Sequence, residues 1–297
     1  MIAPTKHRPI LGLFLGFIGV AAFSLTLPMT RFAVTSIDAG TIIIWRGLIA
    51  ALFSAVILLV FYRQWPRRES IRPLLITGVG IVIGFPGLMT LAMQTVPASH
   101  GAVVVGLLPI STAAVSVLAT NENPSRAFWI VSGLGTMAIM AFVFRLSDGG
   151  FAPGHFYLIA AVVFAAVGYA FGGNAAKEIG APRAICWALV LMSPFLVAGA
   201  FFVAPLPLQA EATSLLAFLY LALVSQLAGF FAWYGGLALG GVARVSQIQL
   251  LQIFMTLIAS AVLLSEPLNM EIWFFSALVM CCVVVSARLR IDTVAKG

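Results

Sequence analysis

Long apolar stretches, separated by short gaps that hold most of the charged residues, constrain this chain more than any other feature. Hydrophobic residues make up 62% of the sequence and charged residues only 8%. A soluble domain carries about 25% charged residues, because its surface must face water. This chain has too few charges to cover such a surface, so its outer face must meet lipid. The sequence therefore predicts an all-α, polytopic membrane protein.

The apolar stretches divide into ten segments, each near the length of roughly 17–25 residues that a spanning helix needs. Proline, glycine and charged clusters mark their ends. The predicted spans are 9–32, 39–62, 73–93, 98–119, 127–145, 155–176, 184–204, 213–235, 242–264 and 270–288. The boundary between the third and fourth spans rests on the polar turn Gln94-Thr95-Val96-Pro97. The first run is longer than the core of a secretory signal and lacks a convincing cleavage site, so we expect it to be retained.

The basic residues predict an orientation. An even number of spans places both termini on one side of the membrane. If that side is the cytoplasm, thirteen of the sixteen Lys and Arg residues lie inside: Lys6, Arg8, Arg63, Arg67, Arg68, Arg72, Arg126, Lys177, Arg183, Arg244, Arg288, Arg290 and Lys296. The positive-inside rule then predicts a multi-pass protein of the cytoplasmic (inner) membrane with cytoplasmic termini. The net charge of +7 is spread over these gaps rather than one polar face, so no nucleic-acid partner is expected.

An internal repeat relates the two halves of the chain. An offset of 144 residues places His100 on Arg244 and Glu122 on Glu266, and each pair brackets an apolar helix that follows a turn of small residues. Five predicted spans separate the copies, and an odd number gives the halves opposite orientations in the bilayer. The predicted halves are residues 9–145 and 152–288, two inverted five-helix repeats of the kind common in secondary transporters.

The same region carries a family resemblance. The second half contains Trp233-Tyr234-Gly235-Gly236-Leu237-Ala238, then Gly241-Val242-Ala243-Arg244-Val245-Ser246, then Leu263-Leu264-Ser265-Glu266-Pro267-Leu268. The first half has a parallel segment in Ala92 to Gly101, Leu107-Leu108-Pro109 and Glu122. In these residues the sequence resembles the EamA-type ten-helix group of the drug/metabolite transporter superfamily. It departs from the family pattern at Ile253, where proline is usual, and at Ser265, where glycine is usual. The resemblance implies a secondary transporter of small metabolites such as amino acids, often an exporter, that works by alternating access.

A polar face in the ninth span is the clearest candidate for a binding surface. Ser246, Gln249, Gln252, Thr256 and Ser260 follow steps of three and four residues and therefore share one helical face. Amides and hydroxyls both donate and accept hydrogen bonds, which suits an uncharged or zwitterionic solute. The alternative is that this face holds the helix to a neighbour. The predicted substrate-binding residues are Ser246, Gln249, Gln252, Thr256, Gln226, Trp233, Tyr169, Asn174, Thr30 and Gln94.

Other polar or small residues within the spans have open interpretations. Arg46 in the second span is interpreted as a structural or snorkelling residue, with binding of a carboxylate as the alternative. Pro28 in the first span and Pro86 in the third predict kinks that free backbone carbonyls. Gly168 and Gly172 are spaced for close helix packing.

Several function classes are disfavoured. The sequence has no His-Glu-x-x-His motif, and its three histidines lie near span ends, so we expect no enzyme. The three cysteines lack metal-ligand spacing, and no cofactor is expected. No acidic residue falls at the centre of a span, which favours movement down a gradient, although ion coupling is left open. The predicted partners are a small-molecule substrate and the lipid bilayer. A homodimer is left open, as is a channel-like or scaffold protein without carrier activity.

Overall fold

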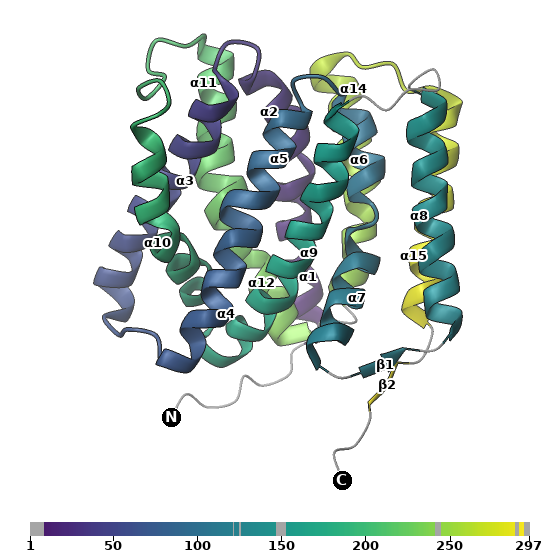
Figure 1. The fold of residues 1–297 in the computed structure, drawn as a ribbon, viewed down its shortest axis with the longest axis horizontal. Coiled ribbons are helices and arrows are strands. Elements are labelled where there is room, and N and C mark those ends of the chain that lie inside the picture. Colours follow the sequence, from purple (N-terminus) through teal and green to yellow (C-terminus); the bar gives the residue numbers. More distant parts are fainter. Residues whose placement is uncertain are drawn as a thin grey trace.

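The computed structural model describes residues 9–120, 122–124, 126–146, 153–240, 245–288 and 291–293. In these ranges the chain is a bundle of helices with one short ribbon, in which β1 (Glu122–Pro124) pairs antiparallel with β2 (Ile291–Thr293). Figure 1 shows the helices standing side by side, with the start of α1 and the end of α15 at the same, lower end of the bundle. The predicted helical fold is therefore found, with the ribbon as an addition to it.

Within the described ranges, six helical segments are long and apolar enough to cross a membrane. They are α1 (Pro9–Ser24) with α2 (Thr26–Ala33); α3 (Ala39–Ile57) with η1 (Leu58–Tyr62); α4 (Arg68–Gly78) with η2 (Val79–Gly84) and α5 (Phe85–Ala92); α9 (Pro153–Ile179); α10 (Ala181–Ala200); and α11 (Ala212–Leu219) with η3 (Tyr220–Ala228) and α12 (Gly229–Gly240). The remaining helices are α6 (Ala98–Val105), α7 (Leu108–Thr120), α8 (Arg126–Leu146), η4 (Ser246–Gln249), α14 (Leu250–Leu264) and α15 (Met270–Arg288). They include four shorter apolar stretches, which fall where the fourth, fifth, ninth and tenth spans are predicted.

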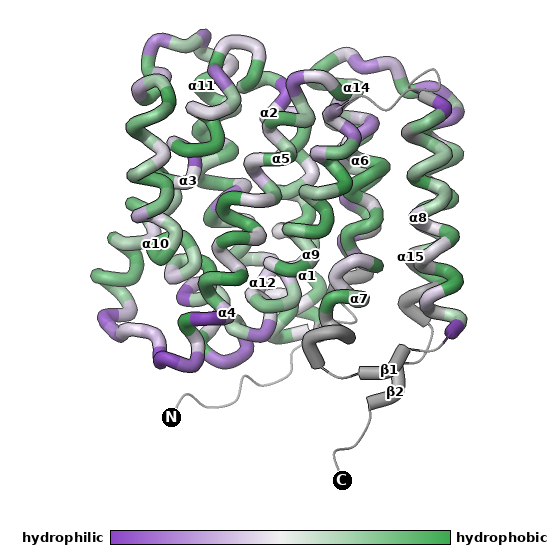
Figure 2. Tube along the Cα trace, in the orientation of Figure 1, coloured by the Kyte–Doolittle hydropathy of each residue, from purple (hydrophilic) through white to green (hydrophobic). Residues whose placement is uncertain are grey.

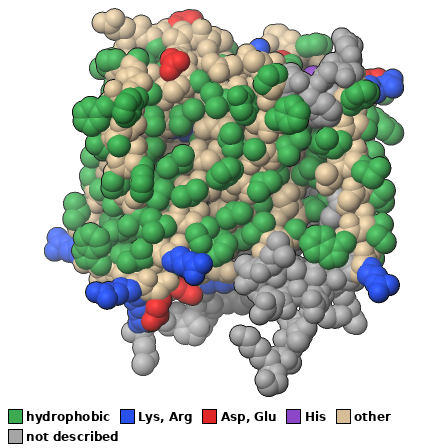
Figure 3. All heavy atoms as spheres, viewed as in Figure 1, with side chains coloured by type: hydrophobic (Ala, Val, Ile, Leu, Met, Phe, Trp, Pro, Cys, Tyr) green, Lys and Arg blue, Asp and Glu red, His purple; other side chains and the backbone are tan. Residues whose placement is uncertain are grey.

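The outer surface of the bundle is apolar around its middle. Figure 2 shows hydrophobic residues along the centres of the helices and hydrophilic ones towards the two ends. Figure 3 shows the same belt on one face, with most Lys and Arg side chains along the lower rim. Large side chains such as Phe14, Leu52, Ile130, Phe195 and Val262 are exposed. This surface is suited to a hydrocarbon environment, and the protein is a multi-pass membrane protein.

Glycines bring helices from the two halves into backbone contact. A Cβ atom on Gly236 of α12 would lie 2.7 Å from the backbone nitrogen of Gly16 in α1. A Cβ atom on Gly80 of η2 would lie 2.8 Å from Cα of Gly168 in α9. Gly172 faces the ring of Tyr234, whose hydroxyl donates to the carbonyl of Gly168 at 3.3 Å. The packing role predicted for Gly168 and Gly172 is confirmed.

Both prolines at which a kink is predicted, Pro28 and Pro86, lie close to irregular helix geometry. The first predicted span is interrupted at Leu25, between α1 and α2. Because Pro28 has no N–H, the carbonyl of Ser24 four residues earlier has no helical partner. Pro86 follows the π-helical segment η2. Such π segments occur often at functional sites. The described residues hold two others, η1 and η3, which the sequence did not predict.

Candidate substrate-binding site

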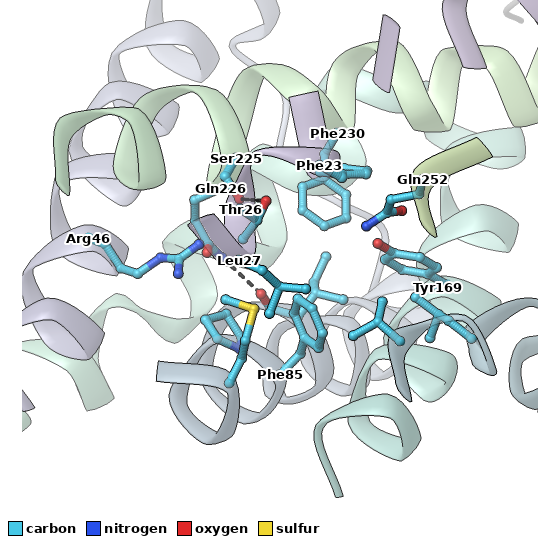
Figure 4. A pocket seen from close by; sticks show the side chains of 15 residues that line it. Phe23, Thr26, Leu27, Arg46, Phe85, Tyr169, Ser225, Gln226, Phe230 and Gln252 are labelled. Atoms are coloured by element: carbon cyan, nitrogen blue, oxygen red, sulfur yellow. Dashed lines mark hydrogen bonds between the residues drawn. The ribbon is translucent and has the colours of Figure 1, made fainter. Parts of the chain in front are cut away.

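A central cavity lies among the helices, and Figure 4 shows the side chains around it. Most lining residues lie near the middle of their helical segments. The lining consists of Phe23, Thr26, Leu27, Arg46, Ile81, Phe85, Pro86, Met89, Val105, Leu108, Tyr169, Ser225, Gln226, Phe230 and Gln252. The cavity volume is about 20 Å³, although the whole space between the wall atoms is about 430 Å³. A volume of that size accommodates a water molecule rather than a metabolite.

A second cavity adjoins the first. It is lined by Leu27, Ala102, Val105, Gly106, Gln249, Gln252, Ile253 and Thr256, and its volume is about 10 Å³. Leu27, Val105 and Gln252 belong to both linings. The two cavities are therefore neighbouring parts of one internal region, separated by these shared side chains.

Among the described residues, Arg46 is the only charged one in either lining. It lies on the inward face of α3, with Ile42, Ala50 and Ser54, and only 2% of it is exposed. Its Nε and Nη1 atoms have no hydrogen-bond partner among the described residues. Figure 4 shows its guanidinium group directed towards Gln226 and Thr26. The snorkelling interpretation is wrong, because a snorkelling arginine reaches water with its charged group.

Polar groups from both halves meet next to Arg46. The amide nitrogen Nε2 of Gln226 donates to the carbonyl of Ile81 at 2.9 Å, and this bond joins the π-helical segments η3 and η2. The hydroxyl groups of Thr26 and Ser225 lie 2.8 Å apart and share a hydrogen bond in which either can donate. Two hydroxyl groups hold two protons and this bond uses one of them, so the pair retains a further donor.

The polar face of the ninth span serves two purposes. Thr256 donates to the carbonyl of Ser24 at 2.9 Å, the carbonyl that Pro28 deprives of its helical partner. Gln249 and Gln252 are buried, and each has a side-chain amide atom without a partner in the described part of the chain. Thr256 therefore holds two helices together, as the alternative interpretation expected, whereas the two glutamines line the cavities. The side chain of Ser246 lies outside the described residues.

Aromatic rings form one wall of the central cavity. The ring of Phe23 lies 4.9 Å from that of Phe230 and 6.5 Å from that of Tyr169, measured between ring centroids. Trp233 packs behind them, 6.0 Å from Tyr169 and 6.4 Å from Phe23. Tyr169 thus lines the cavity, whereas Trp233 supports this wall from outside the lining.

Three predicted site residues lie elsewhere. Thr30 is buried, but its hydroxyl donates to the carbonyl of Thr26 in its own helix at 2.7 Å, and it lines neither cavity. Asn174 is exposed on α9, and Gln94 is exposed in the turn between α5 and α6. Of the predicted set, Tyr169, Gln226, Gln249, Gln252 and Thr256 are brought together.

The predicted set omitted Thr26, Ser225 and the phenylalanines of the wall. For Arg46, a binding role was only the alternative interpretation. The spacing of Ile42, Arg46, Ala50 and Ser54 could have indicated that Arg46 faces inwards, because these residues share one face of α3.

A carboxylate caps the first turn of α6, near the upper end of the bundle in Figure 1. Helix α6 begins after Pro97, which has no side-chain acceptor to cap the first backbone amides. Oε1 of Glu266 accepts from the amide of Ala98, and Oε2 accepts from the amide of Ser99, both at 2.8 Å. Glu266 follows α14, so this cap joins the second half of the chain to the first.

Known proteins resemble this chain over nearly its whole length. The model of the EamA-like transporter family matches residues 10–144 and again residues 152–288. The uncharacterized transporter YdeK of Bacillus subtilis (strain 168) is 39% identical over 275 residues, which cover 92% of this chain and 96% of that protein. A protein solved by crystallography aligns over 94% of this chain and 96% of its own length, with a TM-score of 0.64 and 15% identity, a likeness that concerns the fold alone. Sequence and relatives agree that this membrane transporter belongs to the EamA-like transporter family.

Proposed function

We propose that the chain is a secondary transporter that moves small metabolites across the cytoplasmic membrane by alternating access, with the central cavity as its binding site. The observation that carries this proposal is the composition of the cavity wall. The half 9–145 supplies Thr26, Arg46 and Phe85, among others, and the half 152–288 supplies Tyr169, Ser225, Gln226, Phe230 and Gln252. A site formed by both repeats changes its access when the groups of helices around it move against each other.

Helix packing supports an inverted repeat of two five-span halves. If each predicted span n corresponds to span n + 5, the repeat exchanges the two members of each of these pairs: α3 with α10, α6 with α14, and α8 with α15. Two corresponding helices can then pack against each other about the symmetry axis. These pairs are in contact. The contact of α1 with α12 should then have a counterpart between the third and sixth spans, and η2 and α5 do pack on α9.

Two of the three π-helical segments, η2 and η3, support the same correspondence, whereas the offset places η1 on the non-helical residues 202–206. The offset of 144 residues places Ile81 of η2 on Ser225 and Gly84 on Ala228, both within η3. Since π segments are rare in helices, their occurrence at equivalent places favours a common origin of the halves.

The small volume of the central cavity supports a conformational change during transport. A metabolite needs a pocket of about 300 Å³ or more, well above the cavity volume of about 20 Å³. Substrate must therefore enter a wider conformation than this one. We propose that transport runs outward from the cytoplasm, as the family resemblance suggests, and that both termini are cytoplasmic.

Counterflow in proteoliposomes tests the carrier proposal. Vesicles loaded with a concentrated extract of small metabolites are diluted into trace amounts of the same isotopically labelled compounds, and uptake is followed by mass spectrometry. A carrier accelerates the uptake of its labelled substrate when unlabelled substrate is inside. The Q249L/Q252L variant should lose this uptake, because it removes two amides from the cavity walls. Its control is Q64L/Q209L, the same exchange at two glutamines exposed in connecting segments.

Two results would contradict the carrier proposal. Uptake that is independent of internal substrate would favour the channel-like alternative, and no uptake at all would favour a scaffold. Unchanged counterflow by Q249L/Q252L would show that the two amides are not part of the site.

Cysteine labelling tests the orientation separately. In a cysteine-free background, a membrane-impermeant thiol reagent should label Gln209→Cys in intact cells but Gln64→Cys only after permeabilisation. The reverse pattern would place the termini outside.

A further inference from the structure

Arg46 is a buried charge without a counter-ion. Among the described residues the ion pair found is Arg145 with Glu271, and it lies at the surface, with 67% and 41% of the side chains exposed. No acidic side chain in the described part of the chain lines either cavity. A guanidinium group remains protonated in proteins, and an uncompensated buried charge is strongly destabilising. The folded chain therefore maintains an unfavourable group in the wall of the cavity.

We propose that Arg46 binds the carboxylate of an organic anion, which makes the substrate of this transporter a monocarboxylic acid with an apolar body. This inference rests on the proposed carrier function and specifies its substrate class. The planar guanidinium group can donate two parallel hydrogen bonds to a carboxylate. Its Nε and Nη1 atoms are buried without partners among the described residues, and each of them can pair with Nη2 to present two parallel donors to a carboxylate.

The groups beside Arg46 suit a single carboxylate. The hydroxyl pair of Thr26 and Ser225 retains one donor, which can supplement the guanidinium group. The amide of Gln226 is already bonded to Ile81. One fixed positive charge balances a carboxylate, whereas a phosphate monoester carries nearly two negative charges at neutral pH. The charge at this end of the cavity therefore favours a monocarboxylate over a phosphate ester.

The side chains that line the remainder of the cavity indicate the chemistry of the rest of the anion. Figure 4 shows Phe23, Leu27, Phe85 and Phe230 between the Arg46 end and an opposite end where Gln252 and Tyr169 lie close together. Aromatic and aliphatic walls bind apolar surface, which an inorganic anion lacks. At the far end, Oε1 of Gln252 has no partner among the described residues and can accept a hydrogen bond from a hydroxyl group. Along the cavity from Arg46 to Gln252, the proposed substrate therefore has a carboxylate, an apolar body and a polar group at the far end.

A net anion also fits better than the zwitterion that the glutamines alone suggested. The ammonium group of an amino acid would need an acceptor of negative charge. Neither cavity offers a carboxylate among the lining residues that the structure describes. Binding a zwitterion would therefore satisfy Arg46 and leave a second buried charge uncompensated.

The binding test uses purified protein and matched pools of compounds. One pool contains benzoate, phenylacetate, 4-hydroxyphenylacetate and hexanoate, and the second contains the four corresponding carboxamides. Phenyl phosphate is tested alone. Melting temperature is measured for wild type, R46Q and R46K. The acids should stabilise wild type more than the carboxamides or phenyl phosphate do. In R46Q the apparent affinity for the acids should fall about 10- to 100-fold, the equivalent of a hydrogen bond to a charged group, and R46K should be intermediate.

The melting temperature without ligand separates a binding role from a structural one. If Arg46 is kept for substrate, R46Q removes an uncompensated charge, so its melting temperature should equal or exceed that of wild type. If Arg46 holds the fold together, R46Q should melt at a lower temperature. The control is R31Q, because Arg31 lies outside both linings and donates to the carbonyl of Met93. R31Q should melt at or below the wild-type temperature and keep its preference for the acids.

The outcomes distinguish this inference from the carrier proposal. No preference for the acids by wild type, an unchanged preference in R46Q, or a lowered melting temperature of empty R46Q would each overturn the assignment of Arg46. Equal or stronger stabilisation by phenyl phosphate would overturn the choice of carboxylate. Preferential acid binding without counterflow of any of these acids would leave the anion site in place and contradict carrier function.

Discussion

Replacement of Glu266 by alanine tests whether one carboxylate holds the two halves together at the upper end of the bundle. The carboxylate accepts the first two amides of α6, each at 2.8 Å. These amides have no partner within their own helix, and Pro97 before them offers no capping side chain. Since Glu266 also places a negative charge at a helix N-terminus, it interacts favourably with the helix dipole.

The expected loss of stability follows from these contacts. A hydrogen bond to a charged group contributes about 1.5–3 kcal/mol, and two such bonds set an upper range of about 3–6 kcal/mol. Both bonds are only partly buried, so in the variant water can bond the freed amides and recover part of the lost energy. The expected net loss of stability is about 2–3 kcal/mol. At about 2–4 °C per kcal/mol for a large domain, this corresponds to a decrease of roughly 4–12 °C in melting temperature. E266Q keeps one acceptor oxygen without the charge and should lie between E266A and wild type.

Thermal unfolding of the detergent-purified protein measures this change, and hydrogen exchange locates it. Amide exchange should accelerate in the peptide that covers residues 96–105. The matched control is E271A, which breaks an exposed ion pair with Arg145 and should change stability by at most about 1 kcal/mol. If E266A and E271A melt at the same temperature and exchange over 96–105 is unchanged, the capping argument is wrong.

Two further variants test the packing of the helices. Thr256→Val should lower the free energy of unfolding by about 1–2 kcal/mol, because the carbonyl of Ser24 loses its donor, while Thr256→Ser should retain most of it; equal melting temperatures for the two would contradict this. Gly80→Ala should destabilise by about 1–3 kcal/mol through overlap with α9, whereas Gly133→Ala, which has open space around it, should be neutral by thermal unfolding. A neutral Gly80→Ala would show that the two helices can separate without loss.

Hydropathy predicted most of the fold, because a segment that crosses lipid must be helical and mostly apolar. The apolar segments, the kink at Pro28 and the close packing at Gly168 each follow from local chemistry. The π segment η3 could not be predicted, since Ser225 and Gln226 have ordinary helix propensities and their irregular backbone depends on the helices around them.

The candidate site was harder to predict than the fold. The stripe of Gln249 and Gln252 was visible because polar residues stand out against an apolar helix. The inward position of Arg46 depends on how α3 rotates against its neighbours, and that rotation is fixed by packing with α10 and η3 rather than by α3 itself. Gln94 and Asn174 were chosen as polar residues within or near spans, but both belong to exposed positions close to helix ends.

The glycine contact between α1 and α12 bears on which parts of the protein can move. At Gly16 and Gly236 the two backbones touch without side chains between them, so neither helix can slide or tilt far without moving the other. These helices come from different halves of the sequence, and the contact of η2 with α9 joins the halves a second time. In the alternating access that we propose, pairs of helices from different repeats therefore move together, and the moving groups differ from the two halves of the sequence.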